Sequence, residues 1–461
     1  MKIKIFYKFI IIGVLGLSIP SCFVGKKYAT PDVVDHSLYR TDSIVQEEDS
    51  TTLADISWQD MFTDSFLIKY LNEGLENNTD INVAYQQIMV AEAYYKQGKA
   101  GNLPLISASG EARRNMFWDA NGMNNFELVA NLSWEVDIWG KIRSQKRATE
   151  ANYLQSVAVH QAVKTRLIAN IASLYYQLLS LDEQLRIAEE TVINRESSLE
   201  TTHALQEAGT ITAVAVQQTE AQLHSARALV VELKRSIKTV ENAFSILLGK
   251  EAEGIERGSL NDQEIAMEEI RIGFPAQLLR NRPDVMAAEY NLVNAFELTN
   301  VAKSNFYPSL NLSARGGVSS NQLDNLFSVN SIFASIAGSL TQPILNARQI
   351  RTQYEVAQSQ QEIAYLNFKQ SIITASREVS DALYTITSAD ELVGIKAQEF
   401  AAYDTAVEHS EALLNSGFAN YLEVLTARQN ALYAQLDLID ARFNRLNGTV
   451  ELYRALGGGW E

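Results

Sequence analysis

A long internal repeat constrains this chain more than any other feature of its sequence. Identical residues recur 208 positions apart, without a gap from Leu132 to Gly249, and nearer the start of each half the offset is 204. The matched pairs include Leu132 and Leu340, Tyr176 and Tyr384, Gly209 and Gly417, and Gly249 and Gly457. A period of this length exceeds that of solenoid repeats, which reach about 50 residues. The sequence therefore predicts one large structural module that occurs twice.

The first module contains a long segment without helix breakers. Neither Gly nor Pro occurs between Gly140 and Gly209, and these are the residue types that most strongly interrupt helices. Apolar residues follow alternating steps of four and three through this segment, which is the heptad pattern of a coiled coil. They are Leu167, Ile171, Leu174, Leu178, Leu181, Leu185, Ala188 and Val192. The second half repeats the layout with smaller residues, so each module is expected to hold a long helical hairpin that turns at Gly209 or Gly417. Shorter helices are expected near 80–100 and 283–305.

Each module also contains two segments in which apolar and polar residues alternate. Apolar residues occupy every second position in Phe126–Ile138 and in Ile332–Leu340. Leu103–Arg113 and Leu310–Ser320 alternate similarly and are the expected partner strands. Strands of this length with one apolar face fit an outer-membrane barrel, although a half-buried strand on a soluble core alternates in the same way. No other sheet or amphipathic segment is left to cover the apolar faces, which favours the membrane.

Four strands are too few to close a barrel. In lipid, an open sheet edge would leave backbone N–H and C=O groups without hydrogen bonds, at a cost of several kcal/mol for each group. If the strands lie in the membrane, the barrel must be shared between chains. The sequence therefore predicts that the protein is an oligomer.

The N-terminus has the pattern of an export signal. Three lysines precede Phe9–Ile19, an apolar run of 11 residues, which is shorter than the roughly 20 residues of a membrane-spanning helix. Ile19-Pro20-Ser21-Cys22 resembles a bacterial lipobox, so residues 1–21 are expected to be removed and Cys22, the only cysteine, to be acylated. The loss of three lysines takes the formal net charge from −16 to −19. Such an acidic exported chain is a poor candidate for binding nucleic acid or anionic membrane surfaces.

Five blocks in order resemble the TolC-like outer-membrane efflux channels, specifically the lipoprotein branch of RND-type efflux systems, the NodT-like outer membrane factors. The blocks are Cys22–Pro31, Trp58–Asp64, Asn77–Ile81, Phe274–Asp284 and Ala302–Leu310. The resemblance implies a mainly α fold with a membrane β part. In that fold, a duplicated module of long coiled-coil helices and two β-hairpins trimerises into a shared 12-stranded β-barrel, which is continuous with an α-helical barrel.

The resemblance and the repeat together predict the organisation of the chain. The expected segments are a signal peptide (1–21), a lipidated N-terminal and collar segment (22–79), a first repeat of helix, β-hairpin and long helical hairpin (80–249), an equatorial connecting segment (250–282), a second repeat (283–457) and a C-terminal tail (458–461).

The resemblance further implies the role of an exit duct in the outer membrane, lipid-anchored, spanning by the barrel and extending into the periplasm. Its expected partners are two further copies of the chain, a periplasmic adaptor protein, an inner-membrane RND pump and outer-membrane lipid. A closed periplasmic gate is expected at Leu422, Glu423 and Thr426, where Thr426 occupies a position that is usually acidic. The expected adaptor contacts at the hairpin tips are Gly209, Thr210, Ile211, Gly417, Phe418 and Asn420.

Two other functions stay open from the sequence. One is a structural periplasmic coiled-coil lipoprotein without an open lumen, and the other is the same channel fold serving an ABC-type secretion system. An enzyme is not expected, because the five histidines lack metal-ligand spacing and the chain contains no phosphate-binding loop or nucleophile elbow. Accordingly, no catalytic residue, cofactor or metal site is predicted.

Overall fold

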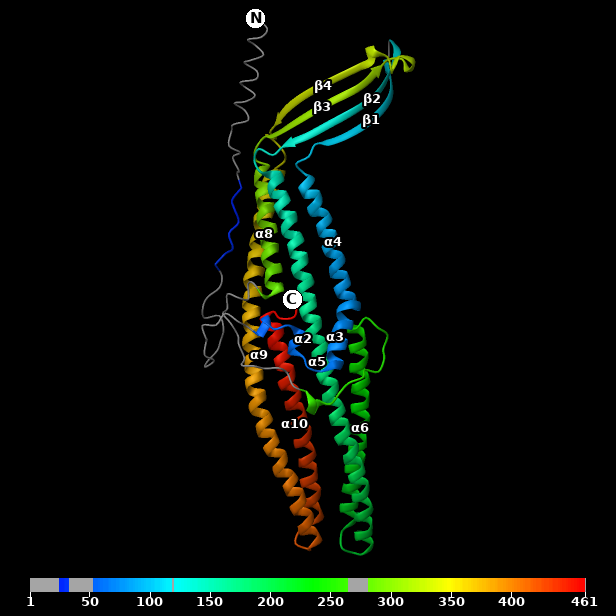
Figure 1. Ribbon diagram of the computed structural model, residues 1–461, viewed down its shortest axis with the longest axis vertical. Coiled ribbons are helices and arrows are strands. Elements are labelled where there is room, and N and C mark those ends of the chain that lie inside the picture. Colours follow the sequence, from blue (N-terminus) through cyan, green and yellow to red (C-terminus); the bar gives the residue numbers. More distant parts are fainter. Residues whose placement is uncertain (1–24, 33–52, 118–119, 264–280, 461) are drawn as a thin grey trace. The chain divides into compact units, whose positions relative to one another are not determined.

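The computed structural model describes residues 25–32, 53–117, 120–263 and 281–460 (Figure 1). The elements in chain order are η1 (Leu53–Asp55), α2 (Trp58–Met61), α3 (Ser65–Asn77), α4 (Thr79–Ala100), β1 (Leu105–Phe117), β2 (Ala120–Val136), α5 (Lys141–Glu207), α6 (Ala213–Leu247), η2 (Leu260–Asp262), α8 (Pro283–Ser304), β3 (Ser309–Ser320), η4 (Leu323–Asn325), η5 (Val329–Ser331), β4 (Ile332–Thr341), α9 (Gln349–Asn415) and α10 (Tyr421–Leu456). The expected signal peptide and Cys22 lie outside the described residues. Among the helices that the structure describes, none has the length and apolar content needed to cross a membrane.

The two halves of the chain form the same elements at the offsets seen in the sequence. The helices α5 and α9 each contain 67 residues, and their first residues, Lys141 and Gln349, are 208 positions apart. The helices α4 and α8 each contain 22 residues, and their first residues, Thr79 and Pro283, are 204 positions apart. The predicted duplication of one module, with its two long helices, is therefore confirmed.

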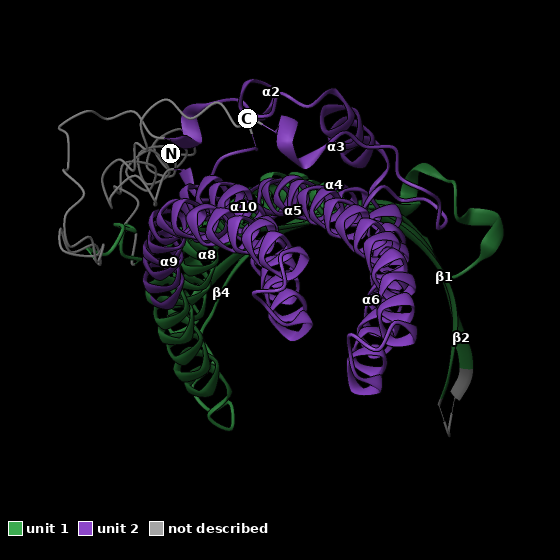
Figure 2. Ribbon diagram, turned by 90° about the horizontal axis from the view of Figure 1, so that it is seen from below, with its two compact units in different colours: residues 1–32, 87–157, 287–369 green, residues 33–86, 158–286, 370–461 purple. Residues whose placement is uncertain are grey.

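The chain divides into two compact units, which Figure 2 colours separately. Unit 1 comprises residues 1–32, 87–157 and 287–369, and it contains the sheet and the helical segments next to it. Unit 2 comprises residues 33–86, 158–286 and 370–461, and it contains most of the two hairpins α5–α6 and α9–α10. Each unit thus takes equivalent segments from both halves of the repeat.

The sheet of unit 1 has four antiparallel strands in the order β1-β2-β3-β4. Leu132 on β2 pairs with Ile106 on β1 and with Ala314 on β3, so these apolar residues share one face. The residues between them point to the other face because side chains alternate along a strand. There Asn131 pairs with Arg315. The register therefore gives the sheet one apolar and one polar face, as the alternation predicts.

The first hairpin is longer than the alternation predicts. Strand β1 covers Leu105–Phe117 instead of Leu103–Arg113, and β2 begins at Ala120, six residues before the expected start at Phe126. The residues between Arg113 and Phe126 are largely polar and do not alternate. Ladder hydrogen bonds join backbone groups and need no apolar side chain, so the hydrophobic pattern underestimates this hairpin.

The long hairpins of unit 2 bury the predicted heptad positions. In α5, Leu167, Ile171 and Leu178 are almost fully buried, and in α9 the smaller Ala375 and Val379 take the corresponding role. Burying apolar surface contributes roughly 25 cal/mol for each Å² removed from water. The stability of these long helices thus comes mainly from packing between them, because an isolated helix is marginal in water.

Candidate functional site

The two hairpins of unit 2 end in turns with the same backbone geometry. Gly209 has φ +75° and Gly417 has φ +77°, the left-handed region that glycine adopts at little cost. The amide of Thr210 donates to the carbonyl of Leu205 at 2.9 Å, and the amide of Phe418 donates to that of Leu413 at the same distance. A Cβ at either glycine would meet no atom within 4 Å, so the turn and not close packing requires glycine.

The predicted gate residues lie together in the first two turns of α10. Leu422, Glu423 and Thr426 are all exposed, whereas Val424 and Leu425 between them are buried. This split places the three predicted gate residues on the exposed side of α10. Leu422 exposes 55% of its surface, although leucine is an apolar residue that normally gains free energy from burial.

A reciprocal cap fixes the carboxylate of the predicted gate residue Glu423. The side-chain oxygen of Asn420 accepts a hydrogen bond from the backbone N–H of Glu423 at 3.1 Å, and the Asn420 amide donates to Glu423 Oε1 at 2.9 Å. Thr426 Oγ1 donates to the carbonyl of Leu422 at 2.9 Å. A carboxylate in the first turn also interacts favourably with the positive end of the helix dipole. The carboxylate of Glu423 is therefore held at the start of α10.

Five of the six predicted adaptor-contacting residues are exposed. Phe418 exposes 84% of its surface, and Thr210 and Asn420 are exposed as well. Thr210 Oγ1 donates to the carbonyl of Leu205 at 2.7 Å, which holds that side chain against the end of α5. Ile211 is half-buried. Phe418 therefore gains little from packing within this chain.

Polar links between α5 and α10, which the sequence motifs do not predict, join the two hairpins of unit 2. Arg195 exposes 6% of its surface, and its guanidinium donates to Gln429 Oε1 at 2.7 Å. Arg428 donates to Ser198 Oγ and forms an ion pair with Glu411 at 2.6 Å. Burial lowers the pKa of the Arg195 guanidinium, and the nearby Arg428 lowers it further. Arg195 continues the heptad series after Val192, so a charged residue at a predicted seam position was the available signal.

The polar face of the sheet in unit 1 carries a charged network. Arg315 on β3 donates to Glu127 Oε1 at 2.9 Å and to Asn131 Oδ1 at 3.2 Å, both on β2. Asn131 in turn donates to Ser109 Oγ on β1 at 3.2 Å. Three strands are thus joined by polar side chains, an arrangement that suits a face in contact with water.

The described part of the N-terminal arm, residues 25–32, runs along α8 within unit 1. The backbone N–H of Lys26 donates to Asn300 Oδ1 at 3.2 Å, and the Asn300 amide donates back to the carbonyl of Lys26 at 3.1 Å. Thr30 Oγ1 donates to Glu289 Oε1 at 2.7 Å. Asn300 lies in the last turns of α8, which leads to β3. Cys22 precedes Lys26 by four residues, a span of at most about 14 Å of extended chain.

Nothing in the described residues forms a metal-binding centre: they contain no cluster of three or more His, Cys, Asp or Glu side chains that could hold an ion. The features that remain are paired helical hairpins with capped, exposed turns and a two-faced sheet. They define a TolC-like channel architecture.

The model of the family described as outer membrane efflux protein matches residues 70–250 and 274–458, and the chain belongs to this family. It is similar to the cation efflux system protein CusC of Escherichia coli O6:H1, with 26% identity over 451 residues that cover 97% of this chain and 98% of CusC. It is also similar to the probable outer membrane lipoprotein SilC of Salmonella typhimurium, with 28% identity over 408 residues that cover 88% of each chain.

Solved structures agree with this assignment. The open state of the MtrE outer membrane channel of Neisseria gonorrhoeae superposes with a TM-score of 0.86 and 25% identity, over 95% of this chain and 99% of MtrE. A crystal structure of CusC also gives a TM-score of 0.86, with 26% identity, over 95% of this chain and all of CusC. The protein is thus an outer-membrane efflux channel, and its role is in transport.

Proposed function

We propose that three copies of this chain form the outer-membrane exit duct of a tripartite RND-type efflux pump. The observation that carries the proposal is the sheet of unit 1, which has an apolar face, a polar face and two free edges, β1 and β4. Pairing β1 of one copy with β4 of the next satisfies both edges, and three copies give a closed barrel of 12 strands. The apolar face then contacts lipid, and the polar face with Arg315 and Glu127 lines the lumen.

The anchor in this proposal is the acylated Cys22. Because Lys26 is bound near the end of α8 that leads to β3, the cysteine can reach the level at which the strands begin. The anchor adds to the attachment that the barrel supplies. The connecting segments 22–79 and 250–282 form a collar around the helices in this arrangement.

The gate in this proposal is a ring of Leu422 and Glu423 from three chains. The links of Arg195 to Gln429 and of Arg428 to Ser198 hold α10 against α5 in the resting state. Docking of a periplasmic adaptor at the turns of Gly209 and Gly417 separates these helices and opens the ring. Because Thr426 replaces a second acidic residue, the tip carries one carboxylate ring and is less cation-selective than a gate with two.

Passage through the duct is passive in this proposal. The energy comes from the inner-membrane pump, since the chain contains no nucleotide-binding loop. The relatives are named for different cargoes, cations for CusC and toluene for TtgI of Pseudomonas putida. We therefore assign the choice of cargo to the pump.

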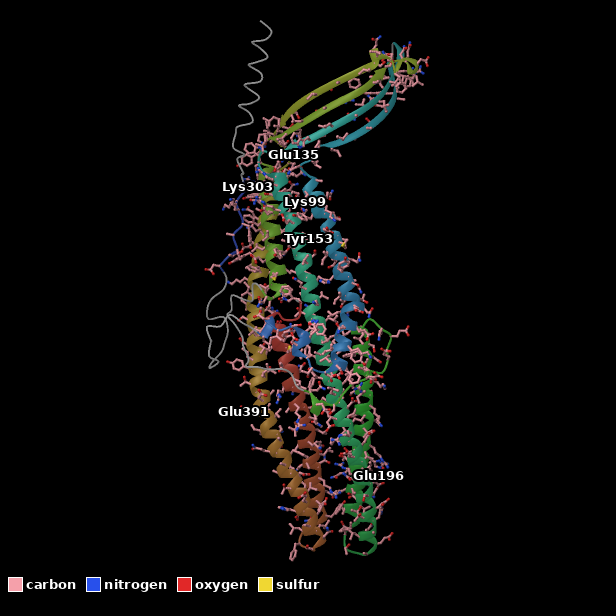
Figure 3. All side chains as sticks on the ribbon, viewed as in Figure 1. Lys99, Glu135, Tyr153, Glu196, Lys303 and Glu391 are labelled. Carbon is pink, nitrogen blue, oxygen red and sulfur yellow. The ribbon has the colours of Figure 1, made fainter. Side chains whose placement is uncertain are left out.

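Conductance in planar bilayers tests this proposal directly. The wild-type protein is compared with the Leu422→Ala/Glu423→Ala double variant, which we expect to raise a small resting conductance several-fold. The matched control is Glu391→Ala/Leu392→Ala, an adjacent pair of the same residue types, exposed along α9 and away from the turn (Figure 3). This control is expected to conduct as the wild type does.

Two outcomes contradict the proposal at different points. A protein that inserts into the bilayer but never conducts, in any variant, is not a duct and behaves as a structural coiled-coil lipoprotein would. A wild-type channel whose conductance is the same in both double variants keeps the duct but removes the gate from Leu422 and Glu423.

A further inference from the structure

A pocket of about 300 Å³ lies within unit 1, where the strands meet the helices. Glu135, which Figure 3 labels at the end of β2, lines one side, and the loop between β4 and α9 lines another. This volume lies at the lower end of the range for small-molecule sites. The channel function does not use the pocket, because neither the gate nor the turns contribute to it.

The polar lining of the pocket is only partly engaged by the protein. The side-chain amides of Asn305, Asn346, Gln349 and Gln353 line it, and none of them has a hydrogen-bond partner among the residues that the structure describes. Amides both donate and accept hydrogen bonds. Four of them around one pocket can therefore bind a ligand that carries both donors and acceptors.

The charges of the pocket are balanced. Among the lining residues, Lys141 Nζ lies 3.0 Å from Glu135 Oε1. The lining residue Asp137 pairs through Oδ2, at 3.1 Å, with Nε of Arg143, which does not itself line the pocket. Two of these four groups, Lys141 and Glu135, line the pocket and are partly exposed, with 39% and 33% of their side-chain surfaces accessible. A cationic and an anionic side chain side by side, with no net charge, are complementary to a zwitterion and not to a net anion.

Aromatic and apolar side chains adjoin this polar set. The rings of Trp139 and Tyr307 are 5.0 Å apart, and the Trp139 indole donates to the carbonyl of Pro308 at 2.8 Å. Trp and Tyr are enriched at the level of lipid headgroups. In the loop after β4, Ile344 and Leu345 expose 92% and 96% of their surfaces. The pocket thus combines a polar, charge-balanced interior with an apolar border.

We propose that this pocket binds the headgroup of a zwitterionic phospholipid of the phosphatidylethanolamine class. The phosphate accepts hydrogen bonds from Lys141 and the amides, the ammonium pairs with Glu135, and the acyl chains extend over the exposed Ile344 and Leu345. The inference rests on the proposed function, because it requires the end of the sheet to lie at the membrane surface.

Native mass spectrometry of the purified protein in detergent tests the inference. The probes are dihexanoyl phosphatidylethanolamine, dihexanoyl phosphatidylglycerol and glycerophosphoethanolamine, which has the headgroup without acyl chains. We expect one phosphatidylethanolamine for each chain, with weaker binding of phosphatidylglycerol because of its net charge. The headgroup alone is expected to bind weakly, at the same site.

The decisive comparison is the Asn346→Ala/Gln353→Ala variant. It removes two amides that have no partner among the described residues, so the fold is expected to stay intact, and phosphatidylethanolamine binding is expected to weaken about tenfold. The matched control is Gln342→Ala/Gln360→Ala, which removes two exposed amides near the pocket that do not line it. The control is expected to bind the lipid as the wild type does.

Three results overturn the inference. The first is equal phosphatidylethanolamine binding by the two double variants, and the second is a preference for phosphatidylglycerol. The third is a loss of trimer in the Asn346→Ala/Gln353→Ala variant in the absence of lipid; this loss would mean that a second copy of the chain occupies the pocket. None of these results contradicts the proposal that the protein is an exit duct. A protein that fails to partition into membranes or to conduct refutes the proposed function instead, so the two failures are distinguishable.

Discussion

At the scale of single residues, the two halves of the repeat use the same contacts to join their helices. Asn78 Nδ2 donates to the carbonyl of Leu247 at 2.9 Å, and Arg282 Nη1 donates to the carbonyl of Ala455 at 3.0 Å. The donors are 204 positions apart and the acceptors 208, so the two bonds are equivalent in the repeat. The larger Arg282 also pairs with Glu378 at 2.8 Å. Both halves of the repeat therefore keep this side-chain to backbone hydrogen bond, but the donor is an amide in the first half and a guanidinium in the second.

Two equivalent glycines make a sharp stability prediction. Gly249 has φ +72° and Gly457 has φ +94°. A Cβ on Gly249 would overlap the carbonyl oxygen of Asn77, and a Cβ on Gly457 would overlap that of Asn281. Each Gly→Ala substitution is expected to destabilise the protein by at least about 2 kcal/mol, since the left-handed backbone alone costs roughly 1–2 kcal/mol. The melting temperature of the detergent-solubilised protein measures the loss.

Gly394→Ala is the control for this pair. It lies inside α9 with no atom within 4 Å of an added Cβ and no positive φ, so alanine is expected to stabilise the helix by about 0.5–1 kcal/mol. Melting temperatures that fall equally in all three variants would show that added bulk, and not the turn geometry of Gly249 and Gly457, is responsible.

At the scale of elements, Arg257 fastens the segment after α6 to the first hairpin. Its guanidinium pairs with Asp182 on α5 and, at 2.9 Å, with Glu241 on α6. Glu241 is 5% exposed and also pairs with Lys238 at 2.7 Å. Burial on its own raises the pKa of the Glu241 carboxyl, but the hydrogen bonds from Lys238 and Arg257 outweigh burial and lower the pKa below its ordinary value.

This shift predicts a dependence of stability on pH. A carboxyl whose pKa is lowered by folding stabilises the protein fully above its ordinary value of 4.5, and this contribution is lost as the pH falls through the folded-state pKa. Glu241→Gln is therefore expected to lower the melting temperature at pH 7, and the difference from the wild type is expected to shrink towards pH 3. Glu196→Gln removes an exposed pair with Arg227 and serves as the control (Figure 3). A Glu241→Gln difference that stays constant with pH would contradict the assignment.

The same elements show how far the sequence alone leads. The absence of Gly and Pro and the heptad spacing predict α5 almost to its ends, because both signals are local. The repeat then predicts α9, although α9 contains Gly394. Arg195 is not predictable in this way, since a pattern of apolar residues cannot indicate a buried guanidinium that is stabilised by Gln429 and a carbonyl. The repeat also does not predict the backbone conformation of Arg348. This residue has φ +66°, and its counterpart in the first half, Gly140, has φ +81°. Such contacts and strains arise only when distant segments pack.

At the scale of the whole molecule, the two free sheet edges are the feature that most requires other chains. The register within the sheet is fixed by backbone pairing from β1 to β4, while nothing in one chain pairs with the outer edges of Leu105–Phe117 and Ile332–Thr341 among the described residues. Edges of this length are unstable when left open, both in water and in lipid. The proposed gate, too, has a function only if three copies of Leu422 surround one axis. Both features therefore require several chains to form a closed ring.

Cysteine cross-linking of β1 to β4 tests whether these two edges pair between neighbouring chains. Ser107 and Ser109 on β1 and Ser335 and Ser339 on β4 lie on the polar face, and Cys22 is the only native cysteine. In variants with one cysteine on each edge, at least one combination is expected to bring two Cα atoms within the roughly 4.4–6.8 Å that a disulfide requires. Oxidation should then give a trimer that survives boiling in SDS and dissociates on reduction. Ser335→Cys/Ser339→Cys places both thiols on one edge and is expected to give no trimer. If no combination of the two edges cross-links in membranes, while the channel still conducts, β1 and β4 do not meet between chains and the barrel must close in another way.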